Sequence, residues 1–160
     1  MAVKDAMNAR APWFFIMEAS RDCWKCKART AVVGFALPRG FEIFEDEDGG
    51  WVGQGGPGIV FWVDRLAANV VAQVQRINGR YRIDFSQTLK VRYWINHCQH
   101  CDAKLGDNYL YNEGKPPFGR MSPEDVAVIR FTRVKEPFLA EVDHFGVAET
   151  LEKAMTDGVG

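Results

Sequence analysis

The sequence has no hydrophobic run long enough to cross a membrane. The apolar stretch Trp13-Phe14-Phe15-Ile16-Met17 is short, whereas a spanning helix needs about 20 such residues. The same stretch is too short for the core of a signal peptide, and the preceding residues, 1–10, are polar. We therefore expect a cytoplasmic protein, in which thiols stay reduced.

The chain also lacks an excess of charge of either sign, since its formal net charge is −1 at pH 7. This balance argues against a dedicated polybasic binding protein, although local basic surface remains compatible with it. No Gly-Lys-Ser or Gly-Lys-Thr sequence is present, so a phosphate-binding loop is not indicated, and no small-molecule cofactor is evident. We expect residues 45–58, an acidic run followed by a glycine-rich run, to form a mobile surface loop.

What the chain does have is enough apolar material for a sizeable core. It contains 160 residues, of which 47% are hydrophobic, and the aromatic residues include five Trp and eleven Phe. This length and composition predict one domain covering residues 1–160 and exclude a disordered chain.

The four cysteines form two C-x-x-C pairs, Cys23/Cys26 and Cys98/Cys101, and no cysteine is left over. Two such pairs on tight turns supply the four thiolate ligands that a structural Zn²⁺ prefers, at about 2.3 Å. Seventy-one residues separate the pairs, whereas a compact zinc ribbon has about 15–20. A zinc ion bound by both pairs would therefore close a long loop, and its first role would be stability.

A thiol–disulfide redox centre at Cys23/Cys26 is the main alternative, because redox proteins also use C-x-x-C motifs. That function needs a strand–helix context, whereas the residues after Cys26 favour a strand. A catalytic zinc needs three protein ligands and an open position. Since four thiolates fill the coordination shell, we expect a structural zinc.

The hydrophobic pattern favours an α+β fold: an antiparallel sheet built around a zinc-ribbon-like four-cysteine site, with one central and one C-terminal helix. The central helix is expected over residues 64–78, capped by Asp64 and ended by Asn78-Gly79. The same residues fit a hairpin that turns at Asn78-Gly79, but few strand formers occur in their first part. The closing helix is expected over residues 147–155. Strands are expected at residues 13–19, 30–37, 41–44, 59–63, 80–85, 89–97 and 126–134.

The residues after the second cysteine pair indicate two local features. A sharp backbone turn follows a zinc-binding C-x-x-C pair, and we expect Gly106 to supply it, with Asp102 at a place where glycine would be more comfortable. Asp107 is expected to cap a short turn through Tyr111.

Several of these residues form a familiar set. Cys23-Trp24-x-Cys26, Ser86-x-Thr88, Tyr93-Trp94, Asn96-His97-Cys98-x-x-Cys101 and Gly106-Asp107 resemble a group of small, uncharacterised bacterial proteins, chromosomal or carried on mobile elements, with paired C-x-x-C motifs. The match covers both cysteine pairs and the strand before the second. The resemblance implies a zinc-ribbon-like metal site and no particular activity.

The three histidines are candidate functional residues of two kinds. His97 and His100 flank thiolates, and a ring N–H can donate to a metal-bound sulfur. Asp143-His144 is similar to the Asp-His step of a zinc-supported HNH nuclease, but no later histidine completes a second metal site. Histidines that face solvent or make structural hydrogen bonds are the alternative.

A basic strand face is the other candidate site. Arg80 and Arg82 alternate along one expected strand, and Lys90 and Arg92 alternate along the next. If the strands pair, the four cations and Trp94 can share one surface, as in sites that bind single-stranded nucleic acid through phosphate contacts and base stacking. The alternative is an ordinary solvated strand face.

These patterns lead to two functional hypotheses. The first is a non-enzymatic zinc-binding protein that binds another protein or single-stranded nucleic acid. The second is an enzyme, either a metal-dependent nuclease that uses His144 or a C-x-x-C thiol–disulfide redox protein. A redox protein should purify without metal, so metal content separates these hypotheses.

Overall fold

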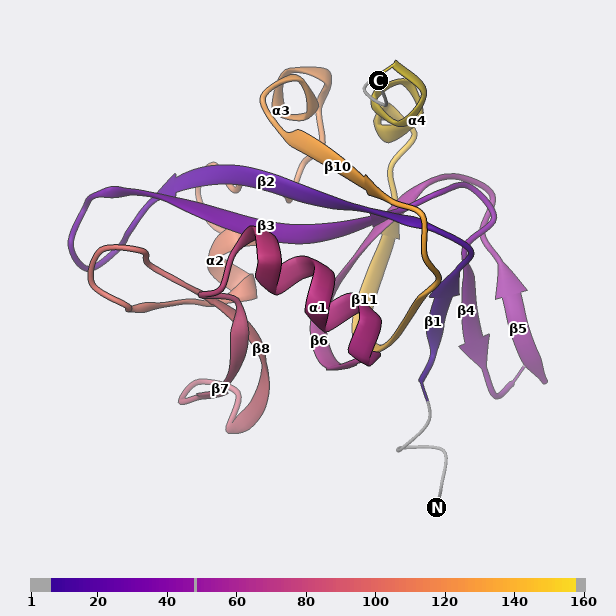
Figure 1. The fold of residues 1–160 in the computed structure, drawn as a ribbon, viewed down its shortest axis with the longest axis horizontal. Helices are drawn as coiled ribbons and strands as arrows, with labels where there is room; N and C mark the ends of the chain where they lie inside the picture. The colour runs from indigo at the N-terminus through magenta and orange to yellow at the C-terminus, as the bar shows by residue number, and fades with distance from the viewer. Residues whose placement is uncertain (1–6, 48, 158–160) are drawn as a thin grey trace.

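Two antiparallel sheets make up most of the computed structural model, which describes residues 7–47 and 49–157 (Figure 1). The larger sheet has eight strands in the order β10-β2-β3-β6-β11-β1-β4-β5. These strands are β1 (Ala9–Ala11), β2 (Phe14–Asp22), β3 (Arg29–Leu37), β4 (Glu42–Glu45), β5 (Gly50–Gly53), β6 (Gly58–Leu66), β10 (Arg130–Val134) and β11 (Phe138–Val147).

The smaller sheet has three strands in the order β7-β8-β9. They are β7 (Arg82–Ser86), β8 (Val91–His97) and β9 (Lys104–Leu105). In Figure 1 the β7–β8 hairpin extends below one end of β2 and β3, and β4 and β5 lie at the opposite end of the molecule.

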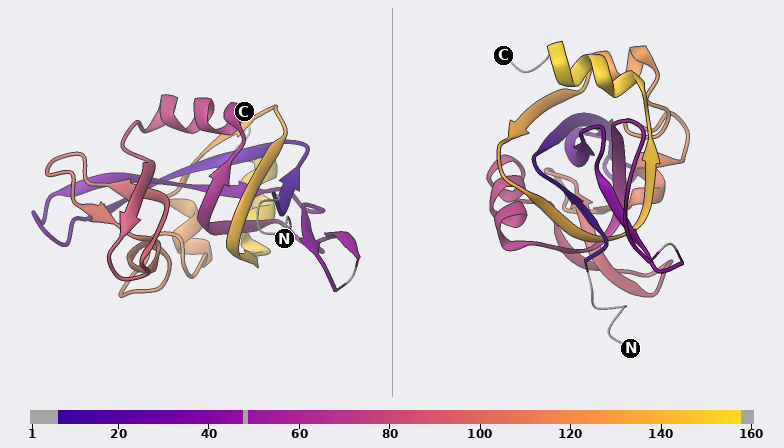
Figure 2. Two further views of the ribbon diagram at one scale, coloured as in Figure 1. Left: turned by 90° about the horizontal axis from the view of Figure 1, so that it is seen from below. Right: turned by 90° about the vertical axis from the view of Figure 1, so that its right-hand side faces the viewer.

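The described residues include four α-helices, where the sequence predicted two. They are α1 (Ala68–Ile77), α2 (Asp107–Tyr111), α3 (Pro123–Ala127) and α4 (Thr150–Asp157). Figure 2 shows α1 on one side of the larger sheet and the other three helices on the opposite side. None of the helices in the described part of the chain is long and apolar enough to cross a membrane.

Because helices lie on both sides, the larger sheet buries both of its faces. Phe14 and Ile16 of β2 belong to one core cluster, while Phe15 and Met17 belong to the other. All four side chains are fully buried. Strand β2 therefore lies between two cores, which explains why four consecutive residues of this strand are apolar.

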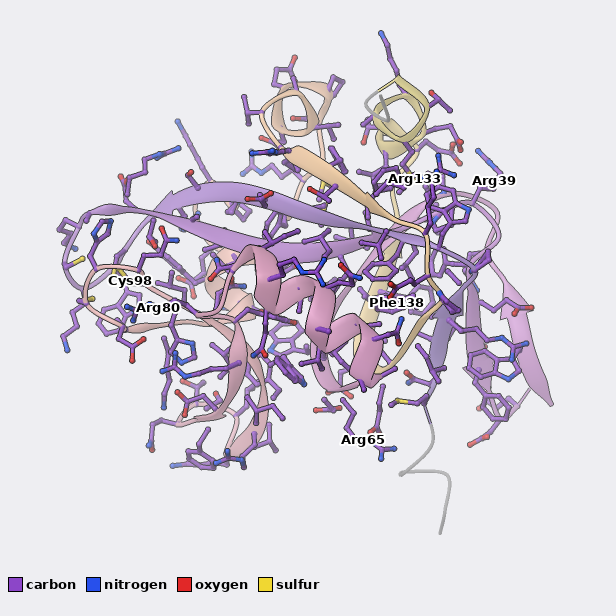
Figure 3. The ribbon with its side chains drawn as sticks, viewed as in Figure 1. Arg39, Arg65, Arg80, Cys98, Arg133 and Phe138 are labelled. Atoms are coloured by element: carbon purple, nitrogen blue, oxygen red, sulfur yellow. The ribbon has the colours of Figure 1, made fainter. Side chains whose placement is uncertain are left out.

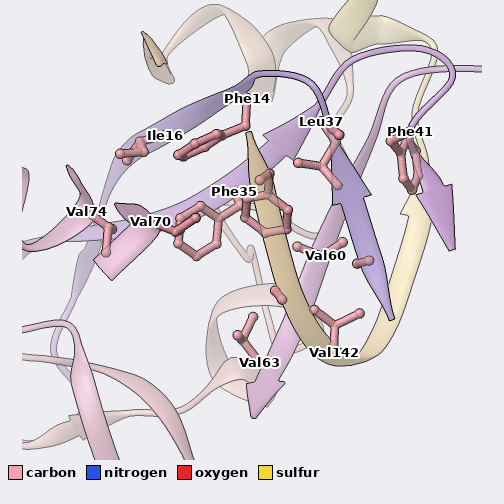
Figure 4. Packing of buried hydrophobic residues seen from close by; sticks show 14 of the residues in the cluster. Phe14, Ile16, Phe35, Leu37, Phe41, Val60, Val63, Val70, Val74 and Val142 are labelled. Atoms are coloured by element: carbon pink, nitrogen blue, oxygen red, sulfur yellow. The ribbon is translucent and has the colours of Figure 1, made fainter. Parts of the chain in front are cut away.

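Aromatic rings form the centre of the first core (Figure 4). The ring centroid of Phe35 lies 6.1 Å from that of Phe14 and 5.3 Å from that of Phe138. Val70 and Val74 of α1 pack against this cluster. Their i, i+4 spacing places both on one face of the helix, so α1 lies with its apolar face on the sheet.

The helix predicted within residues 64–78 is present, and the alternative of a hairpin there is wrong. The helix begins later than predicted, however. Helix α1 begins at Ala68, and Asp64 belongs to β6. Ala67 precedes the helix and contributes no side-chain cap. Strand β6 continues as far as Leu66 because β11, which the sequence analysis did not identify, pairs with it to that point.

The acidic and glycine-rich segment is more regular than expected. Strand β5 lies within residues 45–58 and pairs with β4 in antiparallel register. Phe44 and Trp51 face each other across this pair, with ring centroids 5.5 Å apart. An aromatic cross-strand pair thus compensates for the glycines at both ends of β5.

The C-terminal third also departs from the prediction. The strand expected over residues 126–134 is divided into the end of α3 and the strand β10. Helix α3 begins with a capping box made by Ser122 and Asp125, a strong start signal. Val147 ends β11, and the closing helix begins at Thr150.

Candidate metal centre

The four cysteines meet at one end of the molecule, although they come from distant parts of the chain. Cys23 and Cys26 lie in the turn from β2 to β3, and Cys98 and Cys101 lie in the turn from β8 to β9. The four Sγ atoms all lie within 4.8 Å of one another, and no disulfide joins them. Figure 3 marks this end by Cys98, with Arg80 beside it.

The two turns have the same backbone geometry. In each turn the N–H group two residues after the first cysteine donates to its Sγ at 3.3 Å, from Lys25 to Cys23 and from His100 to Cys98. In each, the residue four positions after that cysteine donates its N–H to the cysteine's carbonyl oxygen, at 3.0 Å and 2.9 Å. Equivalent turns therefore present their sulfurs to each other as a matched pair.

The sharp bend of each turn falls at a residue other than glycine. Lys27 and Asp102, four positions after the first cysteine of each pair, have φ angles of 68° and 63°. Glycine adopts this left-handed conformation most readily. The expectation that Gly106 supplies the bend is therefore wrong: its φ is −68°, and it precedes helix α2.

Two of the distances between the sulfurs match the spacing of ligands around a tetrahedral zinc ion. A Zn–S bond of about 2.3 Å implies a distance of about 3.8 Å between sulfurs at the corners of a tetrahedron. The Sγ atoms of Cys23 and Cys101 lie 3.7 Å apart, and those of Cys26 and Cys98 lie 3.6 Å apart. A disulfide would require about 2.05 Å. The donor set of four thiols and its spacing thus match a metal site and not a pair of disulfides.

The thiols differ in how readily they ionise. Burial raises the pKa of Cys98, but the backbone N–H groups of Cys101 and His100, together with the sulfurs of the first pair, lower it to about 6. A backbone hydrogen bond from Ala28 lowers the pKa of Cys26, yet burial and the three other sulfurs raise it to about 11. Once Cys98 is ionised, ionisation of a second thiol places another negative charge beside it and needs a compensating cation. A divalent metal supplies that cation.

The second cysteine pair is fastened to the edge of β3 that β6 leaves free. The backbone N–H of Gln99 donates to Oγ1 of Thr30 at 2.9 Å, and its side-chain oxygen accepts from the N–H of Ala31 at 3.3 Å. The Nε2–H of His100 donates to the carbonyl oxygen of Arg29 at 3.0 Å. These contacts attach the turn of the smaller sheet to the larger one.

Asn96 of β8 makes the most buried of these attachments. Its side-chain amide donates to the carbonyl oxygen of Val33 and accepts from the N–H of Val33, both at 2.9 Å. Strand β6 pairs with β3 only from Phe35 onward, so the Asn96 side chain replaces a missing strand neighbour. We call Asn96, Gln99 and His100 the β3 clasp.

His97 points away from the sulfurs. Its Nδ1–H donates to the carbonyl oxygen of Arg80 at 2.9 Å, and Nε2 lies 2.8 Å from a carboxylate oxygen of Asp84. The hydrogen bond between His97 and Asp84 is the largest cause of the lowered pKa of Asp84. Neither His97 nor His100 contacts a sulfur through its ring; the contact that His100 makes to Cys98 uses its backbone N–H. The His97 ring therefore holds the smaller sheet together, and the His100 ring joins the second cysteine turn to β3.

The basic residues do not gather on one face. Arg80 and Arg82 both form ion pairs with Asp102, at 2.8 Å and 2.9 Å. In the β7–β8 register Arg82 lies opposite Ile95, whereas Arg92 lies opposite Phe85. Because Arg82 and Phe85 are an odd number of residues apart in β7, the two cross-strand pairs project to opposite sides of the hairpin.

Trp94, the aromatic residue expected beside these cations, is 7% exposed and packs in the first core with Tyr81. A buried ring cannot stack on a nucleobase. The predicted nucleic-acid surface of Arg80, Arg82, Lys90, Arg92 and Trp94 is therefore not assembled as the strand alternation suggested.

His144 stands apart from the cysteines, on β11. Its ring lies 4.6 Å from Trp62 and 5.4 Å from Phe61, measured between centroids. Among the described residues the four cysteines are the one group of His, Cys, Asp and Glu side chains close enough to share a metal ion. His144 thus has no second metal site beside it there.

The sequence analysis missed two residues that position the site. Asn96 was noted only as part of a motif, and Asp107 was expected to cap a turn. Asp107 instead is buried and accepts the N–H of Trp62 through Oδ2 at 2.6 Å, while its own N–H donates to the Tyr93 hydroxyl at 2.9 Å. The polar type of each residue within an apolar strand–turn region was the available signal.

Comparison of this chain with protein-family models, with characterised proteins and with solved structures finds no match. The resemblance to small bacterial proteins with paired C-x-x-C motifs stays a prediction that depends on the quoted motifs. The four-cysteine cluster, consistent with a metal site, is what the sequence and the structure share.

Proposed function

We propose that this chain is a non-enzymatic zinc-binding protein in which the metal is structural and the folded chain binds another protein. The observation that carries the proposal is the set of four cysteine sulfurs, all within 4.8 Å of one another. Four thiolates saturate tetrahedral zinc and leave no position for a substrate or an activated water. The metal would supply no chemistry there beyond holding the two turns together.

The position of the site supports a structural role. Zinc bound by both pairs would close a loop of seventy-one residues and would join the larger sheet to the smaller one. Metal binding contributes folding energy of order 10 kcal/mol in small zinc peptides, and less where a core already exists. The energy would go into fixing the smaller sheet, which on its own has three short strands.

A protein partner fits the surface better than nucleic acid does. Arg80 and Arg82 both pair with Asp102, whose single negative charge offsets one of their two positive charges, and Trp94 is buried. What the smaller sheet exposes instead is aliphatic, at Ile83 and Val91. Aliphatic side chains cannot stack on bases, but they match the apolar centre of a protein interface.

Metal analysis tests the zinc assignment. We expect one zinc per chain in protein purified without chelator, and a loss of most of that zinc in Cys101→Ser. Ser20→Ala, an exposed change in β2, is the matched control and should keep its zinc. Metal-free protein with four titratable thiols would support the redox alternative and overturn the proposal.

An activity assay tests the non-enzymatic part. Cleavage of supplied DNA or RNA in magnesium or manganese that is present in the wild type and lost in His144→Ala would establish the nuclease alternative. We expect no such cleavage, because no second metal cluster accompanies His144 in the described part of the chain.

A further inference from the structure

The β7–β8 hairpin carries three large aliphatic side chains in water. Ile83, Leu89 and Val91 are 42%, 46% and 48% exposed. Burying each of them would be favourable by about 1.5–3 kcal/mol for a complete transfer from water. Two cations, Lys90 and Arg92, alternate with them along the chain. We call these five residues the β7–β8 tip.

The two cations of the β7–β8 tip are free to meet a partner. Arg80 and Arg82 at the base of the hairpin are paired with Asp102, but among the described residues neither Lys90 nor Arg92 forms an ion pair. The tip therefore presents unneutralised positive charge beside aliphatic surface.

The tip is also held in one shape. The N–H of Lys90 donates to the carbonyl oxygen of Ser86 at 2.8 Å, and the N–H of Leu89 donates to the Ser86 hydroxyl at 3.1 Å. Lys104 of β9 donates to the carbonyl oxygen of Phe85 at 2.6 Å. A fixed tip loses little conformational entropy when it binds.

Strand β7 is an edge strand. In the smaller sheet it pairs with β8 on one side and with no strand on the other among the described residues. An edge strand accepts an additional strand through main-chain hydrogen bonds, while side chains of the added strand select the partner.

We propose that the β7–β8 tip and the edge of β7 bind an extended segment of a partner protein that carries both aliphatic and acidic side chains. The inference rests on the proposed function, of which it names the partner class. In the β7–β8 register Ile83 and Arg92 lie on one side of the hairpin and Val91 lies on the other. An extended segment has side chains on both of its faces, so its aliphatic side chains would cover Ile83 and Val91 from the two sides, and carboxylates would meet Lys90 and Arg92. Nucleic acid is the less favoured occupant, because the tip has no exposed aromatic ring and only two free cations.

Selection from a random peptide library displayed on phage, against the zinc-loaded protein, tests this proposal. Enriched peptides are then synthesised with a fluorescent label and titrated by anisotropy. We expect enrichment of Asp or Glu together with Val, Ile or Leu. Lys90→Glu/Arg92→Glu should weaken binding about tenfold, since two exposed ion pairs together amount to roughly 1–2 kcal/mol.

The matched control is Arg76→Glu/Arg120→Glu, which makes the same change in net charge at two exposed positions elsewhere. It should bind the peptides as the wild type does. Val91→Thr keeps the β-branched shape and should also weaken binding, which covers the case in which the charge reversal disturbs the hairpin. Zinc content and circular dichroism of each variant verify folding.

Three results would overturn the proposal: peptides without acidic residues, equal affinity for the wild type and both tip variants, or a labelled thymidine oligonucleotide that binds and is released by Lys90→Glu/Arg92→Glu. In each case one zinc per chain without nuclease or redox activity would leave the structural zinc assignment intact. Metal-free protein would instead refute that assignment itself.

Discussion

At Asp107 a carboxyl group lies where water does not reach. Burial raises its pKa to about 7, against an ordinary value of 3.8, although the hydrogen bond from the N–H of Trp62 opposes the shift. The folded protein therefore holds a proton at Asp107 that the unfolded chain releases near pH 4. The stability that the folded protein gains from this proton is fully present below about pH 4 and is lost as pH rises through about 7.

Asp107→Asn should remove this dependence on pH. The amide oxygen can still accept the N–H of Trp62, and the variant carries no charge to bury. We expect Asp107→Asn to be more stable than the wild type, with an advantage that grows by about 2 kcal/mol between pH 5.5 and pH 8. Urea denaturation at both pH values measures it. Asp46→Asn, in an exposed turn, should show no such growth, and an advantage that does not change with pH would contradict the argument.

At the scale of elements, the β3 clasp replaces a strand. Residues 29–33 of β3 have β2 on one side and side chains of the smaller sheet on the other. Unpaired strand edges attract other chains, and side chains that satisfy the backbone protect against this. The clasp thus joins the two sheets and protects the free edge of β3.

Asn96→Ala should test the clasp. The change removes two buried hydrogen bonds and leaves the N–H and carbonyl oxygen of Val33 without their partner. We expect a loss of about 2–4 kcal/mol in the free energy of unfolding, measured by urea denaturation at constant zinc. Gln99→Ala, whose contacts are more exposed, should cost less. Equal losses in the two variants would show that burial does not set the strength of the clasp.

At the scale of the whole molecule, the cysteines from both turns belong to one of the two cores. The first core contains no cysteine, whereas Cys23 and Cys98 belong to the second. The Phe14–Phe35–Phe138 cluster, with Trp94 of β8, can therefore persist without metal, whereas the turns that carry the cysteines would lose the link between them. Removal of zinc should produce partial unfolding rather than complete unfolding.

Amide hydrogen exchange with and without a zinc chelator measures which segments unfold when the metal is removed. We expect faster exchange in residues 23–32 and 95–105 and unchanged exchange in residues 138–142. Cys26→Ser should give the same pattern without chelator. Uniform acceleration along the chain, or none, would contradict the separation into two cores.

Local signals along the chain predicted the elements whose pattern is complete within one segment. The strands on either side of Cys23-Cys26, the strand before Cys98 and the helix around Val70 and Val74 follow from alternation or from i, i+4 spacing. Strand β11 was missed because its apolar residues contact neighbours far away in sequence, on β6 and β1. Tertiary contacts override a weak local pattern.

The sequence by itself determined the candidate metal ligands of this protein, because two C-x-x-C pairs with no spare cysteine specify four thiols on two tight turns. Only the tertiary structure decided which side chains surround that site and which face solvent. Strand register placed Arg82 and Arg92 on opposite sides of the hairpin, and Asn96 became a partner of β3 since β6 turns away before Val33. Register and edge pairing depend on strands that meet after the chain has folded, so no single segment encodes them.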